Sequence, residues 1–254
     1  MAAPFCWYEL MTSDPAAAGK FYSEAVGWTA QEAQGAMPYT MFLPPGGPAI
    51  AGVMGISPEM AAQGSRPGWV GYVAVDDLEA STAKAAELGG TVHRQPSDIP
   101  GVGRFSVVAD PFGAVILLFH AAPEATMPPD GKGPGFVAWR ELMAGDLEKA
   151  WAFYSALFGW TKDTDHDMGP MGPYRLFKTG GADNAGGMMT KPADMPASFW
   201  TYYFSVDGVR AATARLNAAG GRVINGPMQV PGGDWIVQAL DPQGAVFALH
   251  GTKE

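Results

Sequence analysis

Two tryptophan–glutamate–methionine patterns hold the residues best suited to chemistry in this chain. Each pattern takes every second position of a short apolar run, WYELM at residues 7–11 and WRELM at residues 139–143. Because side chains alternate between the two faces of a strand, each glutamate is expected to share a face with a tryptophan and a methionine. The six residues are Trp7, Glu9, Met11, Trp139, Glu141 and Met143.

Glu9 and Glu141 are compatible with two roles. As catalytic residues, carboxylates enclosed by apolar side chains hold a proton more readily than in water and would act as general bases, or pair with a cationic ligand. As structural acids, they would be neutralised by an arginine such as Arg104 or by backbone amides. Their recurrence does not separate the two roles, because duplication copies structural residues as well.

A repeated segment positions these strands. The spacing Trp, Asp, Gly occurs four times, and each time the Asp opens an expected helix and the Gly closes it. Three further apolar runs follow each helix, so the segment reads β-α-β-β-β. The four sets are Trp7/Asp14/Gly27, Trp69/Asp76/Gly89, Trp139/Asp146/Gly159 and Trp200/Asp207/Gly220.

The four segments group into two domains of an α+β fold. We expect the first domain at 1–122, with modules at about 1–62 and 66–122, and the second at 136–254, with modules at about 136–195 and 197–254. Residues 123–135 are rich in Pro, Gly and Ala, which is typical of a linker.

The segments FYSEAVGW and FYSALFGW after the first helix of each half, and the turns DPFG and DPQG before each last strand, resemble the vicinal oxygen chelate superfamily. That superfamily includes glyoxalase, bleomycin-resistance proteins and extradiol dioxygenases, and the tandem arrangement resembles two-domain bacterial glyoxalase-like proteins. The resemblance implies curled mixed sheets around a cavity in each domain. It also implies a divalent metal held by His, Gln or Glu on the first and last strands of each module.

The metal positions that the resemblance implies carry few ligands in this chain. They fall on Trp7 and Trp139, on Trp69 or Val70, on Trp200 or Thr201, on Leu117 and Ala248, and within 49–56 or 182–190, where Asp183 is the acidic residue. A catalytic divalent ion needs several donors at one point. We therefore predict no metal ligand and no cofactor, although the resemblance allows a divalent metal.

Ten side chains besides Met11 and Met143 are candidates for ligand binding, each with a structural alternative. The tryptophans would stack on a planar ligand or fill the core, and the methionines would line a cavity or fill the core. The tyrosines would donate a hydrogen bond to a ligand or cover a sheet edge, and the arginines would hold a carboxylate or neutralise a glutamate. Beyond Met11 and Met143, the candidates are Trp7, Trp69, Trp139, Trp200, Met54, Met188, Tyr39, Tyr174, Arg104 and Arg175.

An acidic run, DTDHD at 163–167, resembles a calcium loop but lacks the glycine and the final glutamate that such a loop requires. It is typical of a solvated acidic turn. Cys6 is expected to be a core thiol.

Charge and composition limit the partners. The net charge of −9 and the absence of a basic stripe disfavour nucleic acid and anionic membranes. One cysteine and no visible export signal favour the cytoplasm, with the chain as a monomer or homodimer. Three functions remain open: a metal-free small-molecule-binding protein, a glyoxalase-, lyase- or dioxygenase-type enzyme using Glu9, Glu141 or an unrecognised metal site, and an interaction protein without chemistry.

Overall fold

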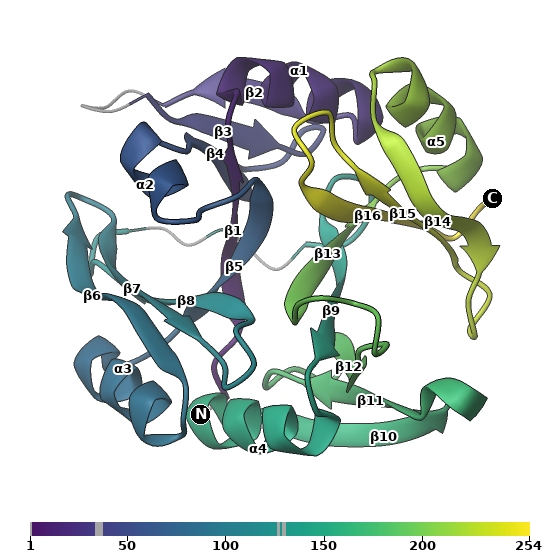
Figure 1. Cartoon of the computed structure of the whole chain (residues 1–254). Helices are drawn as coiled ribbons and strands as arrows, with labels where there is room; N and C mark the ends of the chain where they lie inside the picture. Colours follow the sequence, from purple (N-terminus) through teal and green to yellow (C-terminus); the bar gives the residue numbers. More distant parts are fainter. Residues whose placement is uncertain (1, 34–37, 126–127, 129–130) are drawn as a thin grey trace. The chain divides into compact units, whose positions relative to one another are not determined.

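The computed structural model describes residues 2–33, 38–125, 128 and 131–254. The predicted β-α-β-β-β order is confirmed four times (Figure 1). The first half contains β1 (Phe5–Thr12), α1 (Pro15–Ala25), β2 (Thr29–Glu32), β3 (Thr40–Leu43), β4 (Ala51–Gly55), α2 (Pro58–Ala62), β5 (Gly68–Ala74), α3 (Leu78–Glu87), β6 (Thr91–Ile99), β7 (Gly103–Ala109) and β8 (Val115–Ala121). The second half contains β9 (Val137–Ala144), α4 (Leu147–Phe158), β10 (Thr161–Asp167), the 3₁₀ turn η1 (Gly169–Met171), β11 (Pro173–Lys178), β12 (Gly186–Thr190), β13 (Phe199–Ser205), α5 (Val209–Ala218), β14 (Arg222–Gln229), β15 (Trp235–Leu240) and β16 (Val246–Gly251).

The strands form two eight-stranded mixed sheets, which confirms the α+β class and the tandem arrangement. The strand order is β2-β3-β4-β1-β5-β8-β7-β6 in the first sheet and β10-β11-β12-β9-β13-β16-β15-β14 in the second. The first and last strands of each module are parallel neighbours, and the remaining pairs within a module are antiparallel. The glutamate-bearing strands β1 and β9 therefore lie beside β4 and β12.

Helix capping follows the predicted spacing in two modules and departs from it in the others. Asp14 accepts a hydrogen bond from the backbone nitrogen of Ala17 at 3.0 Å, and Asp146 caps α4 in the same way. In the other two modules the cap lies one residue after the repeat aspartate: Asp77 caps α3, which begins at the predicted Leu78, and Gly208 caps α5 without a side-chain bond.

Two local features differ from the sequence predictions. The helix α2 was not expected; the Ser57 hydroxyl caps it by accepting from the backbone nitrogen of Met60, and Pro58 fits its first turn. The acidic run is a strand, β10, so the predicted turn is wrong. Its Asp165 pairs with Arg175 on the neighbouring β11, and such pairs allow a charged sequence to form a sheet edge.

Contacts divide the chain into two compact units that combine modules from both halves. The first unit comprises residues 1–7, 70–127 and 139–200, and the second comprises 8–69, 128–138 and 201–254. In the first unit α3 packs against α4, and in the second α1 packs against α5 (Figure 1). The predicted boundaries at 1–122, 123–135 and 136–254 divide the chain by its repeat instead, and they stay a prediction.

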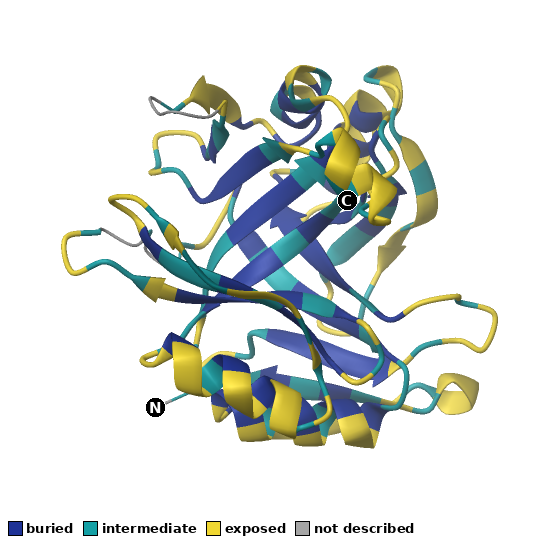
Figure 2. Cartoon of the chain, turned by 60° about the vertical axis from the view of Figure 1, so that its left-hand side comes forward, coloured by how far each residue is buried: buried dark blue, intermediate teal, exposed yellow. Residues whose placement is uncertain are grey.

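An aromatic core lies between the helices and the sheets of each unit. Its rings are Tyr22, Trp28, Phe42, Trp69, Phe204 and Phe247 in the second unit and Tyr154, Phe158, Trp160, Phe177 and Trp200 in the first. Figure 2 shows the helices buried on the side that faces this core and exposed on the other. None of the described helices is long and apolar enough to cross a membrane.

Candidate functional site

Glu9 lies on β1 in the second unit, where its carboxylate accepts a hydrogen bond from Tyr39. The Tyr39 hydroxyl donates a 3.1 Å hydrogen bond to Oε2 of Glu9, whose residue is 5% exposed. In the parallel pair of β1 and β4, Glu9 stands beside Gly52 and Met11 stands beside Met54. The sequence candidates Glu9, Tyr39, Met11 and Met54 are thus brought together; we call this group, with Gly52, the Glu9 site.

Gly52 makes room for the tyrosine. A Cβ atom at this position would lie 1.8 Å from the Tyr39 hydroxyl oxygen and 2.2 Å from the ring carbon that bears it. No side chain at position 52 tolerates such an approach. The glycine at this position therefore allows the Tyr39 phenol to reach Glu9. Sequence analysis missed this residue.

The same arrangement occurs around Glu141 in the first unit. The Tyr174 hydroxyl donates to Oε1 of Glu141 at 3.0 Å, and the indole nitrogen of Trp139 donates to the Tyr174 oxygen at 2.8 Å. Glu141 stands beside Gly187, where a Cβ would lie 2.2 Å from the Tyr174 ring. Trp139, Tyr174, Glu141 and Gly187, together with Met143, form the Glu141 site.

Burial sets the protonation of the tyrosine. Burial, and then the nearby Glu141 charge, raise the pKa of Tyr174 well above its ordinary value, so the phenol keeps its proton and remains a donor. A carboxylate accepts hydrogen bonds through both of its oxygens, and Oε1 of Glu141 accepts from the tyrosine. The pair can accept a hydrogen bond from an OH or NH group, pair with a cation, or take up a proton.

The methionine chosen from the second half is a correction. Met188 was expected to correspond to Met54, but it stands beside Leu142, and both residues are fully buried on the face opposite Glu141. Met189 stands beside Met143, as Met54 does beside Met11, and is the residue that joins the Glu141 site. The matching runs PYTMF and PYRLF differ in residue number by the same amount as Met54 and Met189. This offset in the sequence was the signal that Met189, and not Met188, corresponds to Met54.

Three of the predicted tryptophans lie in packed surroundings. The indole nitrogens of Trp69 and Trp200 donate to the hydroxyls of Tyr22 and Tyr154 at 2.8 and 3.0 Å, within the aromatic cores. Trp7 packs against the cluster of Tyr72, Leu117 and Phe119 in the first unit. This placement favours packing for Trp69 and Trp200, whereas the Trp139 indole bonds directly to Tyr174 of the Glu141 site.

Neither predicted arginine neutralises a site glutamate. Arg104 pairs with Glu79 at 2.5 Å and with Asp98 at 2.8 Å near the surface. Arg175 is buried and pairs with Glu148 at 2.7 Å and with Asp165 at 2.9 Å. The expectation that either one balances Glu9 or Glu141 is therefore wrong, because carboxylates nearer in the fold hold both guanidinium groups.

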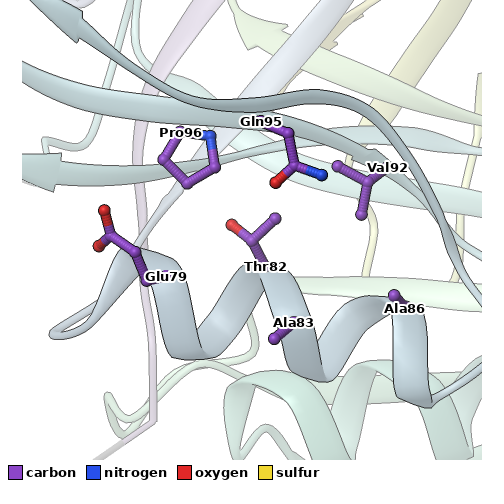
Figure 3. A pocket seen from close by; sticks show the side chains of 7 residues that line it. All are labelled: Glu79, Thr82, Ala83, Ala86, Val92, Gln95 and Pro96. Atoms are coloured by element: carbon purple, nitrogen blue, oxygen red, sulfur yellow. The ribbon is translucent and has the colours of Figure 1, made fainter.

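One hollow lies away from these residues, between α3 and β6 (Figure 3). Its volume is about 340 Å³, and α3 contributes the small side chains Ala83 and Ala86 while β6 contributes Val92 and Pro96. Strand register shifts twice within β6. The hollow contains none of the candidate residues from the sequence.

A divalent metal does not fit the described side chains. Among the residues that the structure describes, no group of three or more His, Cys, Asp or Glu could hold a metal ion. On the paired strands, Glu9 has Gly52 beside it, and Leu117 and Ala248 have Tyr72 and Tyr203 beside them. A single carboxylate at each glutamate site falls short of the donor set that a catalytic ion requires.

Comparison with known proteins finds relatives that match over nearly the whole chain. The model of the Glyoxalase/Bleomycin resistance protein/Dioxygenase superfamily matches residues 5–118 and again residues 136–249. The "Putative glyoxylase CFP32" of Mycobacterium tuberculosis is 35% identical over 248 residues, covering 96% of this chain and 92% of that protein. The anthracycline biosynthesis protein DauV of Streptomyces sp. (strain C5) is 30% identical over 260 residues, covering 98% and 93%.

Solved structures share the fold at low identity. The Mn(II)-bound glyoxalase from Novosphingobium aromaticivorans matches with a TM-score of 0.70 and 16% identity, covering 100% of this chain and 83% of that one. Homoprotocatechuate 2,3-dioxygenase from Brevibacterium fuscum, in complex with 3,4-dihydroxyphenylacetate, matches with a TM-score of 0.68 and 14% identity, covering 100% and 82%. At these identities the likeness concerns the fold alone.

Proposed function

Because this chain belongs to the Glyoxalase/Bleomycin resistance protein/Dioxygenase superfamily, we propose that it binds small molecules through the Glu9 and Glu141 sites without a divalent metal. The observation that carries the proposal is the duplicated arrangement of a buried carboxylate, a tyrosine that donates to it, and a glycine that admits the tyrosine. Each of these carboxylates is at most 8% exposed, and burying a charge costs free energy unless partners compensate it.

The side chains around each carboxylate indicate the class of ligand. Met11 and Met54 provide an adaptable apolar surface beside Glu9, and Met143 and Met189 do so beside Glu141. A carboxylate within such surroundings suits a ligand with an OH, NH or cationic group on an apolar or aromatic frame.

The test combines metal analysis with a ligand screen. Protein purified without chelator is expected to hold far less than one equivalent of Fe, Mn, Ni or Zn. A metabolite panel is expected to yield compounds that raise the melting temperature of the wild type and lose this effect in Glu9→Gln or Glu141→Gln. Glu87→Gln, an exposed change on α3, is the matched control. A stoichiometric metal, or a panel without any binder, would contradict the proposal.

A second candidate is an enzyme of the glyoxalase, lyase or dioxygenase type in which Glu9 or Glu141 acts as general base. The relative named a glyoxylase supports it, as does the capacity of a buried carboxylate to take up a proton. Glu9→Gln and Glu141→Gln would then abolish turnover and leave the melting temperature unchanged. A purely structural acid would give the opposite result.

Further proposals concern the partners, the location and the oligomeric state of the chain. The net charge of −9 supports a chain that acts without nucleic acid or anionic membranes as partners, and the single cysteine agrees with a cytoplasmic location. We propose a monomer or homodimer, which light scattering of the purified protein would distinguish.

A further inference from the structure

The modules β5–β8 and β13–β16 can be compared residue by residue, because their registers match. Leu117 on β8 stands between Tyr72 on β5 and Val107 on β7. Ala248 on β16 stands between Tyr203 on β13 and Gln238 on β15. These rows lie on the face of each sheet that is turned away from its helix, which we call the helix-free face.

The faces that pack toward the helices are apolar in both modules at three matched positions, whereas the buried Ser106, which bonds to Thr82 on α3, corresponds to Val237. Val73, Ile116 and Leu118 in the first of them correspond to Phe204, Phe247 and Leu249 in the other, and all six are fully buried. Such positions fill the core, so an apolar side chain serves each of them equally well.

The helix-free faces diverge in polarity. An apolar residue on β5–β8 corresponds to a polar one on β13–β16 at four matched positions, while the central tyrosine is common to both. The four pairs are Val70/Thr201, Ala74/Ser205, Val107/Gln238 and Phe119/His250.

Two of the four polar residues are buried, which makes the divergence informative. Thr201 is 2% exposed and Ser205 is 9% exposed, so neither gains the hydration of a surface residue. Placing a hydroxyl in a buried position costs free energy unless it forms hydrogen bonds. Packing alone would favour the apolar residues that the matched module retains.

A short hydrogen-bond chain fixes the amide of Gln238. Its nitrogen donates to the Tyr203 hydroxyl at 2.7 Å, and its oxygen accepts from the Asn225 side chain at 3.1 Å. Two such bonds set which end of the amide faces which way. The matched Val107 has no polar atom in its side chain, and Tyr72, Leu117 and Phe119 around it form an apolar cluster.

We propose that the two helix-free faces take ligands of different polarity, with Gln238 and Val107 as the specificity-determining residues. The face on β5–β8 takes an apolar, aromatic group, and the face on β13–β16 takes a polar group with a carbonyl or amide. The inference rests on the proposed function, since it assumes that the chain binds small molecules.

Toluene and acetamide are suitable probes, titrated separately into the full chain labelled on its methyl groups and glutamine amides. Toluene is expected to shift the NMR signals of Val107 and Leu117, and acetamide those of Gln238 and Thr201. Gln238→Val is expected to weaken acetamide binding about fivefold, which corresponds to one neutral hydrogen bond. Val107→Gln is expected to weaken toluene binding at its own face and to leave the acetamide signals unchanged.

Thr201→Val keeps the side-chain volume and serves as the second variant if Gln238→Val does not fold; it too is expected to weaken acetamide binding. Equal shifts on both faces with either probe, or no shift with both, would overturn the inference. These results are separate from those of the glutamate substitutions, which test the proposed function by the loss of ligand-induced stabilisation.

Discussion

The hydroxyl of Tyr22 lies 3.2 Å from Oδ2 of Asp241, so the first helix of the chain is bonded to the turn before its last strand. Tyr154 and Asp110 repeat this bond at 3.2 Å in the first unit. Each tyrosine hydroxyl also accepts from an indole nitrogen, that of Trp69 or Trp200. The repeat tryptophans therefore belong to two equivalent polar centres inside aromatic cores.

Removing one of these hydroxyls should destabilise the fold. Tyr22→Phe leaves the Trp69 nitrogen without its acceptor and Oδ2 of Asp241 without the Tyr22 donor, and unsatisfied buried groups cost about 1–3 kcal/mol each. We expect Tyr22→Phe and Tyr154→Phe to lower the free energy of unfolding by about 2 kcal/mol each, measured by urea denaturation. Lys20→Ala, an exposed change on α1, should alter it by less than about 0.5 kcal/mol.

Substituting the site glycines should expel the tyrosines. Gly52→Ala places a methyl group where the Tyr39 phenol lies, and Gly187→Ala does the same to Tyr174. Each variant is expected to lose about 1–3 kcal/mol of stability and the ligand-induced rise in melting temperature. Gly19→Ala is the matched control: its nearest neighbour would lie at 3.6 Å, so this helical change should stabilise the protein. Unchanged ligand binding in Gly52→Ala would contradict the role assigned to Tyr39.

Local sequence signals predicted the elements well. Asp14 with Pro15 and Gly27 mark both ends of α1, and these signals depend on a few adjacent residues. The same reasoning failed by one residue at Gly208, because a glycine with extended backbone can occupy the cap without a side-chain bond.

The glutamate sites were predicted in part. Glu9 and Glu141 are evident from alternation along a strand, which is a local property. Gly52 and Met189 depend on the register between β1 and β4 and between β9 and β12, and strand register is set by contacts far apart in the sequence. The ion pair of Arg175 with Glu148 also depends on a contact between residues far apart in the sequence, since Glu148 lies on α4.

The ion pairs of Arg175 with Asp165 and Glu148, which we call the Arg175 cluster, should contribute to stability against acid. The Arg175 guanidinium lowers the pKa of Asp165 to about 2, below the ordinary value of about 3.9. Because the pKa of Asp165 is lower in the folded than in the unfolded protein, the stabilisation by this carboxylate is complete above its unfolded pKa. The stabilisation is lost as the pH falls through its folded pKa. Asp165→Asn should therefore cost about 1 kcal/mol at pH 6 and flatten the loss of stability between pH 4 and pH 2.

Urea denaturation at a series of pH values measures this loss. Asp194→Asn, an exposed change that touches no ion pair within the described part of the chain, is the control and should follow the wild type. An Asp165→Asn profile parallel to that of the wild type across the acid range would show that the cluster adds nothing.

The single cysteine should be unreactive in the folded protein. Burial raises the pKa of the Cys6 thiol to about 12, and its Sγ donates to the backbone oxygen of Tyr72 at 3.5 Å. At pH 8 about one thiol in ten thousand is then ionised, and the thiolate is the reactive form. We expect Ellman's reagent to release almost no colour from the native protein within an hour and one equivalent at once in 6 M guanidinium chloride. Rapid, complete reaction of the native protein would show that Cys6 is accessible and ionised, and that its strand does not pack as described.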